Sequence, residues 1–411
     1  MSAIIFATIG DPTVYQEKEY TFQGNGSVKS KASFLAIKEF LKSEISKTVV
    51  ILGISVAEKL KCKDKCTDYD SCRQCITDMT SKELGINDDK SIEYMIAPNI
   101  LGNFKSKPDY FFSYVYYNSL RILEKEKPKK IYLDTSQGIN YMPILGKDAL
   151  LLATSAYAAK QGEEISFGTF NSDPVTNIKG PYEIHLTESI RISPLAGLKY
   201  VTTQILNKDL NYFKSLEDEG IITDGNNNVE KIYRMAIGLD NGLFVYFADK
   251  SDEIQDLIKK FEVDEKVVMR SVGENIILEY KDAKHALVHA LLYVALKFKK
   301  DEQCLDLEKL KEFANKYADA VTSAIIMNEI EQIEEKKRNI TEQKKLLKDV
   351  LGKSGNRLDQ RILYAHGGLP FIATYVYKSG EKICITYGDK IDEIEKHMAN
   401  EDINGNKKQN I

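Results

Sequence analysis

The sequence predicts an α/β protein with a helical second part. A Rossmann-like parallel sheet is expected in residues 1–196, a connector with a β-hairpin in residues 197–280, and a helical domain with a small hairpin in residues 281–411. Three observations lead to this prediction. The 411 residues exceed one ordinary hydrophobic core. Short apolar runs alternate with amphipathic helical segments in the first half, and helical periodicity dominates the last third.

The composition is that of a folded protein without a global charge signal. Hydrophobic residues make up 43% of the chain and charged residues 29%, with a net charge of -4 and a pI of about 5.9. This balance argues against a non-specific DNA coat, but it leaves room for RNA in a local basic cleft. The N-terminal apolar run has no basic segment before it, and the longest later run, 149–159, is about half of a membrane span. We therefore expect a cytoplasmic protein that enters no membrane.

Buried strands and helices alternate in the first domain. The expected strands cover residues 4–9, 48–55, 91–97, 130–134 and 164–170, and the expected helices cover residues 33–46, 113–126 and 147–161. Such alternation favours a parallel sheet, whose ligands bind at the carboxyl ends of the strands near the topological switch point. The loops expected around one crevice there are 8–11, 53–55, 98–103, 134–140 and 171–173.

The pattern changes after about residue 194. An Asn-Gly pair at Asn241 and Gly242 predicts a hairpin of 235–239 with 243–247, and short helices or turns are expected at 252–261 and 264–273. The last third predicts helices at 285–299, 358–366 and 390–398, one or two long helices within 305–350, and a hairpin of 373–377 with 382–387. Interleaved Glu and Lys in residues 329–348 indicate a solvated helix face.

Four of the six cysteines form a cluster, Cys62, Cys66, Cys72 and Cys75. Only the last pair has the spacing of a zinc knuckle, so zinc, disulfides and plain thiols all remain open. Abundant Lys and Glu without Trp are typical of thermophilic proteins, in which intracellular disulfides occur. Each alternative gives the cluster a structural role.

Four of the five histidines carry no chemical signal. His285 and His289 have metal-ligand spacing on one helix face, but no Glu lies between them, so packing in a core or interface is favoured. His185 lies in an expected strand and His397 near the C-terminus, and neither has a companion.

His366 differs because it follows Arg361 at Arg-x4-His spacing before Gly367 and Gly368. A helix C-terminus favours the imidazolium form, and Arg361 is a permanent forked cation for phosphate. RNA cleavage without a metal requires one group that transfers protons at the 2′-hydroxyl and the leaving oxygen, and another that neutralises the charge of the phosphorane. Five positions on a helix separate side chains by about 140°. The pair therefore converges only where the helix frays at Gly367 or where two subunits combine their pairs.

Two loops suit a nucleotide. Gly10 and Gly138 let backbone N–H groups approach phosphate, and Thr135, Ser136 and Asn140 offer neutral hydrogen bonds to ribose or base. Tight turns after buried strands use the same residue types, so a purely structural role is the alternative.

The combination of the segment Asp-Thr-Ser-Gln-Gly-Ile-Asn at 134–140 with a late Arg-x4-His resembles the CARF–HEPN ribonucleases of type III CRISPR systems, over essentially the whole chain. The resemblance implies a CARF ligand-sensing domain, a connector and a HEPN ribonuclease domain within the boundaries given above. It also implies a homodimer or higher homo-oligomer, activation by cyclic oligoadenylate, metal-independent cleavage of single-stranded RNA, and no cofactor.

The resemblance assigns a role to individual residues. The implied ligand-binding residues are Thr8, Gly10, Asp11, Thr135, Ser136, Gln137, Gly138 and Asn140, and the implied catalytic residues are Arg361 and His366. Ile362 departs from the family, which usually has a polar residue after the arginine, and this departure puts the catalytic rate in doubt. Tyr364 is a candidate for positioning the base.

Two other functions remain open. A ligand-responsive transcription regulator would use the same sensor domain, but it needs a basic recognition helix that residues 197–280 lack. Alternatively, the sensor domain also degrades its own ligand, with Thr135 and Ser136 as the candidates.

Overall fold

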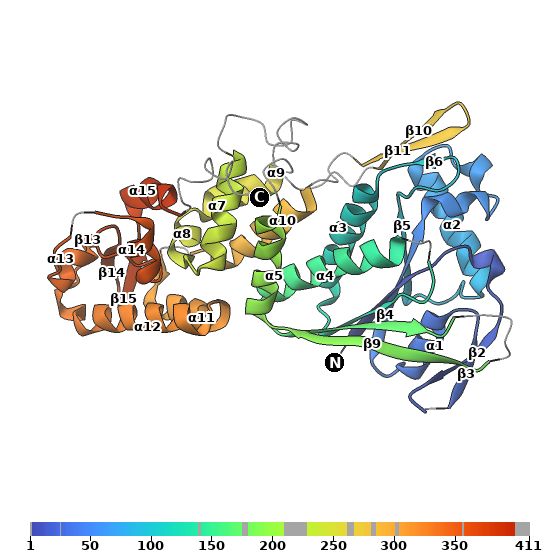
Figure 1. The fold of residues 1–411 in the computed structure, drawn as a ribbon, viewed down its shortest axis with the longest axis horizontal. Coiled ribbons are helices and arrows are strands. Elements are labelled where there is room, and N and C mark those ends of the chain that lie inside the picture. Colours follow the sequence, from blue (N-terminus) through green and yellow to red (C-terminus); the bar gives the residue numbers. More distant parts are fainter. Residues whose placement is uncertain are drawn as a thin grey trace, which may run out of the picture. The chain divides into compact units, whose positions relative to one another are not determined.

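The structure is a computed structural model that describes residues 2–24, 26–138, 141–174, 180–208, 228–260, 267–280, 285–300, 304–355 and 357–398 (Figure 1). Contacts divide the chain into two compact units. The first comprises residues 1–157, 164–192 and 263–286, and the second comprises residues 158–163, 193–262 and 287–411. The residues of the expected connector, 197–280, are shared between the two units.

A sheet forms the centre of the first unit (Figure 1). It has eight strands in the order β3-β2-β9-β8-β7-β1-β4-β5. Five neighbouring strands are parallel: β1 (Ala3–Thr8), β4 (Ile45–Gly53), β5 (Ile92–Ala97), β7 (Lys130–Asp134) and β8 (Ile165–Ser172). These strands are rich in buried aliphatic residues, as expected for a sheet covered on both faces. The predicted parallel α/β fold of this part is confirmed.

Three further strands extend one side of the sheet. β9 (Tyr182–Ile192) runs antiparallel to β8, and β2 (Lys18–Phe22) and β3 (Ser27–Ser30) follow it outward. Most residues of these strands are exposed or half-buried, and β3 has no buried residue, so they lack the continuous apolar runs that marked the inner strands.

The helices of the first unit include two that the sequence predicted well and one that it missed. They are α1 (Ser33–Phe40), α2 (Tyr69–Leu84), α3 (Pro108–Glu126) and α4 (Met142–Gln161). α1 is shorter than expected because Ile45 already pairs with β1. α2 carries the cysteine-rich segment, and it begins at an Asp68 capping box and ends at Gly85.

Two predictions for residues 235–273 are wrong. Residues 235–247 form no hairpin but helices α7 (Asn228–Asp240) and α8 (Phe244–Asp249), because Met235, Ala236 and Leu239 share one buried helical face. Gly242 has φ +72° and ends α7, which uses the same left-handed backbone as a hairpin turn. The hairpin lies instead at β10 (Val267–Val272) and β11 (Asn275–Tyr280), where a short helix or turn had been expected, and it pairs with β6 (Phe104–Lys105).

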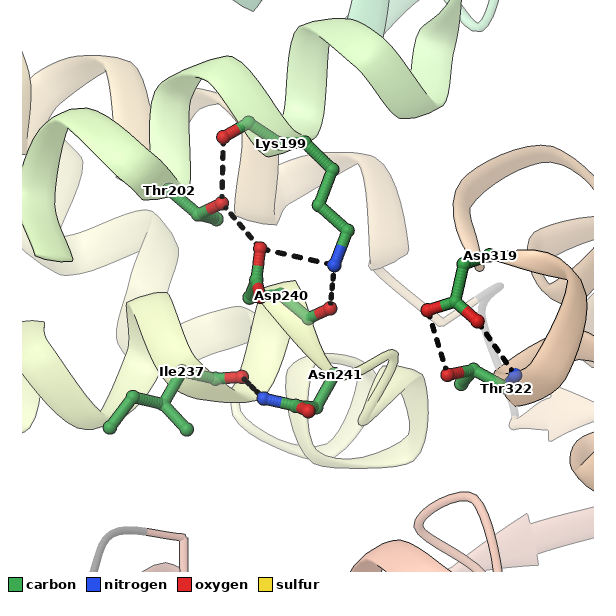
Figure 2. Close-up of polar contacts among 7 residues, drawn as sticks. All are labelled: Lys199, Thr202, Ile237, Asp240, Asn241, Asp319 and Thr322. Atoms are coloured by element: carbon green, nitrogen blue, oxygen red, sulfur yellow. Dashed lines mark hydrogen bonds and ion pairs between the residues drawn. The ribbon is translucent and has the colours of Figure 1, made fainter.

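In the second unit, polar contacts join α5 (Pro194–Leu206) to the end of α7 (Figure 2). Lys199 Nζ lies 3.2 Å from Asp240 Oδ1 and also donates to the Asp240 carbonyl, and Thr202 donates to Asp240 Oδ1 over 2.9 Å. The same view shows Asp319 accepting from Thr322, where α12 (Ala320–Glu335) begins. That backbone N–H is the main cause of the lowered pKa of Asp319.

The rest of the second unit is helical with one small sheet. Its remaining helices are α9 (Ser251–Lys260), α10 (Ala286–Ala295), α11 (Leu307–Tyr317), α13 (Leu347–Leu351), α14 (Gln360–Ala365) and α15 (Ile391–Lys396). The sheet has the order β12-β15-β14-β13, from β12 (Leu305–Asp306), β15 (Lys382–Thr386), β14 (Tyr375–Ser379) and β13 (Lys345–Leu346). The predicted hairpin of 373–377 with 382–387 is confirmed. The one or two long helices expected within 305–350 are instead α11, α12 and α13 together with the short strands β12 and β13.

The six cysteines form three disulfides: Cys62–Cys75, Cys66–Cys72 and Cys304–Cys384. Of the three alternatives for the cysteine cluster, the structure therefore has disulfides. Within the described residues, no group of three or more His, Cys, Asp or Glu side chains is arranged to hold a metal ion. No helix in the described part of the chain has the length and apolar character needed to cross a membrane.

Candidate functional site

The two loops predicted to bind a nucleotide leave neighbouring strands. β1 pairs in parallel with β7 on one side and β4 on the other, so the loops after β1 and β7 emerge at the same edge of the sheet. The chain builds β4 and β5 on one side of β1 before it returns to β7 and β8 on the other. These loops therefore flank the topological switch point, where ligands of open α/β sheets bind.

Direct contacts hold the two loops together. The Thr8 hydroxyl donates to the Gln137 carbonyl over 2.8 Å, and a Cβ added at Gly10 would lie 4.0 Å from the carbonyl carbon of Gly138. The Gly10 N–H donates to the Tyr15 hydroxyl over 2.9 Å. The structure thus brings together residues that are about 130 positions apart in the sequence.

Most of the predicted ligand-binding hydroxyls are used within the protein. Thr8 is buried, and Thr135 Oγ1 donates to the Phe170 carbonyl over 3.0 Å. Ser136 Oγ donates to Asp134 and accepts from the Ser172 N–H over 2.8 Å. These side chains shape the loops.

Three further predicted residues differ from one another in what they offer to a ligand. The Asp11 carboxylate accepts from the Thr13 N–H over 3.0 Å and so caps a turn. Gly138 is exposed, and Gln137 Oε1 is a buried acceptor without a partner among the described residues. Asn140 lies outside the described residues. The exposed backbone at Gly138 is therefore the most available group, and the Gln137 Oε1 atom is a buried acceptor that still lacks a partner in the described part of the chain.

Asp134, the first residue of the segment 134–140, supports this loop, although it was not among the residues expected to bind the ligand. Its carboxylate is buried and accepts from the Ser33 hydroxyl over 2.5 Å and from the Ser136 N–H over 3.0 Å. Burial raises the pKa of Asp134, although the hydrogen bonds from Ser136 and Ser33 act in the opposite direction.

His185 has a partner, contrary to prediction. Its Nε2 lies 2.9 Å from Asp173 Oδ1, close to the end of β8. The pair is exposed, and hydrogen bonding by His185 lowers the pKa of Asp173. His285 and His289 are both buried, and the His289 ring stacks on Tyr293. The prediction that these two residues pack in a core is confirmed.

In the second unit, α14 presents Arg361 and His366. The helix begins at Asp359, whose side chain accepts from the Ile362 N–H over 2.8 Å, and His366 occupies the C-cap position. Gly367 and Gly368 follow with φ +55° and φ +76°, so the helix stops where the sequence predicted. Arg361 is exposed and forms no hydrogen bond or ion pair with the described part of the chain.

The structure pairs His366 with Glu329 and not with Arg361. His366 Nδ1 lies 2.8 Å from Glu329 Oε1, and the imidazole ring meets the Phe371 ring edge-on at 5.5 Å. Glu329 is only 4% exposed, so its predicted place on a solvated helix face is wrong. The Tyr364 hydroxyl donates to the Met398 carbonyl, so Tyr364 does not hold the imidazole as expected.

A signal for Glu329 was present in the sequence. Ile326, Ile330 and Ile333 are buried on the same face of α12 at helical spacing, and Glu329 interrupts that apolar stripe. A carboxylate in such a position needs a buried partner. Glu329 begins the segment of interleaved Glu and Lys at 329–348, and for that reason it was assigned to the solvated face of the helix.

Comparison with known proteins places both candidate regions in described families. Residues 4–174 match the family model for the CARF domain of the CRISPR system endoribonuclease Csx1, and residues 319–390 match the model for its HEPN domain. The first match contains both sheet-edge loops, and the second contains Arg361, His366 and Glu329.

Two individual proteins are also similar. The CRISPR system endoribonuclease Csx1 of Methanocaldococcus jannaschii is 25% identical over 367 residues, which cover 81% of this chain and 76% of that protein. A solved structure of Enterococcus italicus Csm6 bound to cyclic hexa-2′-fluoro-hexa-dAMP aligns with 90% of this chain and 93% of that chain at 12% identity, with a TM-score of 0.28. A score of this size establishes no common fold. The two domain matches and the Methanocaldococcus relative show that the chain belongs to the CRISPR-associated CARF–HEPN ribonuclease family.

Proposed function

We propose that the chain is a metal-independent endoribonuclease for single-stranded RNA in type III CRISPR antiviral defence, activated by cyclic oligoadenylate. Tetra-adenylate is the expected ring. The observation that carries this proposal is the position of His366 at the end of α14, with its Nδ1 held by a carboxylate and Arg361 exposed on the same short helix. Both residues lie in the segment that matches the HEPN domain.

These two side chains suit cleavage by the neighbouring 2′-hydroxyl. His366 would accept the proton of that hydroxyl and return a proton to the departing 5′-oxygen. Arg361 would neutralise the charge of the phosphorane. The P–O2′ bond forms as the P–O5′ bond breaks, which leaves a 2′,3′-cyclic phosphate and a 5′-hydroxyl. No step of this reaction requires a metal ion or another cofactor.

The first unit would bind the activator at the loops after β1 and β7. The switch-point position, the exposed backbone at Gly138 and the Gln137 amide support this assignment. The solved structure of Enterococcus italicus Csm6 contains bound cyclic hexa-2′-fluoro-hexa-dAMP. That likeness is too weak to carry the argument, so the assignment rests on the loops and on the family.

A homodimer is the expected assembly. Exposed apolar side chains lie on three segments that follow the carboxyl ends of β1, β5 and β7, namely Val14 (67% exposed), Leu101 (43%) and Ile144 in the first turn of α4 (66%). Exposed apolar groups gathered at one edge are typical of an interaction surface. A two-fold axis at that edge would place two copies of the activator loops around one ligand, and a symmetric ligand suits such an arrangement.

The proposal is tested by cleavage of a labelled single-stranded RNA in EDTA. The wild-type chain and His366→Ala are compared without ligand, with cyclic tetra-adenylate and with cyclic hexa-adenylate. We expect cleavage by the wild type only with an activator, faster with the tetra-adenylate, and none by His366→Ala. His366→Ala removes the partner of the buried Glu329 carboxylate, so circular dichroism and thermal unfolding check that the variant is folded under the assay conditions.

Other results would redirect the proposal. Cleavage that needs a divalent ion contradicts the metal-independent mechanism, and cleavage by His366→Ala contradicts the assigned base. If the chain binds the ligand and duplex DNA in a salt-sensitive manner but cuts no RNA, the transcription regulator is the better function.

A further inference from the structure

Glu329 occupies a position that folding alone would give to an aliphatic residue. It lies on the buried face of α12 between Ile326 and Ile330, and its side chain is 5% exposed. Glu329 Oε1 faces His366 Nδ1 at 2.8 Å, and Oε2 is buried without a partner among the described residues. The carboxylate thus has one polar partner in this part of the chain, and that partner is the proposed catalytic base.

The arrangement brings no clear advantage in stability. A buried carboxylate pays a large desolvation cost, and exchanging a buried ionic group for an apolar residue of similar volume is often neutral or stabilising. One unsatisfied buried oxygen adds to that cost. A charged residue in a buried apolar stripe is an exception that proteins commonly make at functional sites. The position of Glu329 therefore points to a role in the site that contains His366.

The backbone fixes how His366 meets this carboxylate. Gly367 packs so closely on α12 that a Cβ there would lie 2.6 Å from Ile326 Cγ1, one helical turn before Glu329. The Phe371 ring lies edge-on to the imidazole. Two neighbours on different elements therefore restrict the ring, and Nδ1 is turned toward the carboxylate.

A carboxylate at Nδ1 determines which nitrogen carries the proton. An ionised carboxyl group only accepts hydrogen bonds, so the Nδ1 atom must be the N–H donor. The lone pair of the neutral imidazole is then on Nε2, the nitrogen that can receive a proton from RNA. When Nε2 has taken the 2′-hydroxyl proton, the imidazolium charge lies beside the Glu329 carboxylate.

We propose that Glu329 is a positioning residue that holds His366 with its proton on Nδ1 and its Nε2 free for the 2′-hydroxyl of RNA. This inference rests on the proposed ribonuclease function, because it assigns a task to the same imidazole. Glu329 itself contacts no reacting atom. Its loss should therefore lower kcat and leave KM nearly unchanged.

The kinetic test uses three full-length variants in the activated RNA cleavage assay. Glu329→Gln keeps the shape without the charge, and Glu329→Leu completes the apolar stripe of α12. We expect both to lower kcat by about 10- to 100-fold with KM within about twofold of the wild type. Glu331→Gln, an exposed position two residues further on the same helix, is the matched control and should behave as the wild type.

Thermal unfolding separates a positioning role from a structural one. Because Leu suits the stripe, Glu329→Leu should unfold at the same temperature as the wild type or higher while its kcat falls. A loss of folding in Glu329→Leu that explains the loss of kcat, or an unchanged kcat in both Glu329 variants, would overturn the proposal.

A spectroscopic readout tests the inference without any RNA cleavage. In the full-length chain labelled with ¹⁵N-histidine, the His366 signals are identified by their absence in His366→Ala. Near pH 8 we expect the proton on Nδ1 in the wild type and a mixture of tautomers in Glu329→Leu. A proton on Nε2 in the wild type would contradict the inference. If the His366 proton is on Nδ1 as expected but the wild type cuts no RNA, the proposed ribonuclease function is wrong. The inference that Glu329 orients the His366 imidazole is then still supported.

Discussion

Gly138 adopts a backbone conformation, φ +137°, that residues with a side chain rarely take up. A Cβ there would also lie 3.0 Å from Pro143 Cγ and 3.2 Å from the Thr8 hydroxyl. We therefore expect Gly138→Ala to destabilise the chain by about 1–3 kcal/mol and to weaken binding of cyclic tetra-adenylate. Urea unfolding and isothermal calorimetry measure the two effects.

Gly10 provides the matched comparison in the neighbouring loop. A Cβ at Gly10 would make only an ordinary contact, 3.8 Å from the Tyr15 hydroxyl. Gly10→Ala should therefore fold as well as the wild type. Ligand affinity that survives in both variants would show that the activator binds elsewhere.

Burial of Asp134 makes the free energy of unfolding of the chain depend on pH. Because burial raises the pKa of Asp134 above its ordinary value of 3.8, the folded chain holds this proton more tightly than the unfolded chain does. The contribution is fully present below pH 3.8 and is lost as the pH rises through the raised value. Asp134→Asn removes the titration, and its amide can still accept from Ser136 and donate to Ser33.

Because the stabilising contribution of Asp134 is lost as the pH rises, the wild type and Asp134→Asn should differ in how their stability depends on pH. The free energy of unfolding of Asp134→Asn, relative to the wild type, should increase from pH 4 to the pH at which Asp134 is fully ionised, and then level off. Urea unfolding at several pH values measures this difference. A difference that does not change with pH would show that Asp134 has an ordinary pKa in the folded chain.

At the scale of elements, the contact of the α14 terminus with α12 positions the proposed catalytic residue. Gly367 has φ +55°, and a Cβ there would lie 2.6 Å from Ile326 Cγ1. Gly367→Ala should destabilise the chain by about 2–4 kcal/mol and lower activated RNA cleavage at least as much as the Glu329 variants do, because the movement separates His366 from Glu329.

Gly380 is the control for that variant. It has φ +61° in the β14–β15 turn, and a Cβ there would meet nothing within 4 Å. Gly380→Ala should cost only the backbone term of about 1 kcal/mol and keep its activity. Equal losses in the two variants would mean that the contact with α12 is unimportant.

The sequence predicted those elements whose signal is local. Continuous apolar runs identified β1, β4 and β7, whereas β9 escaped because its outer face is exposed. The Asn-Gly pair at Asn241 was misread because a left-handed glycine ends helices as well as hairpin turns.

The candidate site was predicted in the same uneven way. Arg361 and His366 were visible as a motif on a helix that ends at Gly367, and the sheet-edge loops followed from the strand order. The pairing of His366 with Glu329 spans 37 residues and depends on how α14 packs against α12, which no local pattern encodes. The internal bonds of Thr8, Thr135 and Ser136 likewise became visible only in the fold.

For the whole molecule, the proposed cleavage requires two chains to act together. In one chain His366 bonds to Glu329, and no contact joins it to Arg361 in the described part of the structure. Ile144, at the sheet edge, is 66% exposed and is a suitable position at which to break the expected dimer.

We expect Ile144→Glu to shift the chain toward a monomer in sedimentation velocity and to lower activated cleavage in proportion. Burying a charge in a symmetric apolar interface is costly, and two-fold symmetry introduces it twice. The control Val272→Glu changes an apolar side chain of similar exposure, 56%, in the β10 strand and should not alter assembly. A wild-type chain that is monomeric yet fully active would refute the shared site.

The chemical identity of the RNA ends tests the central claim most directly. A single-stranded RNA is cut by the full-length chain in EDTA with cyclic tetra-adenylate, and the fragments are weighed by mass spectrometry. We expect a 2′,3′-cyclic phosphate on the upstream fragment and a 5′-hydroxyl on the downstream fragment, because the 2′-hydroxyl is the proposed nucleophile. Fragments with a 3′-hydroxyl and a 5′-phosphate, or cleavage that EDTA abolishes, would contradict it.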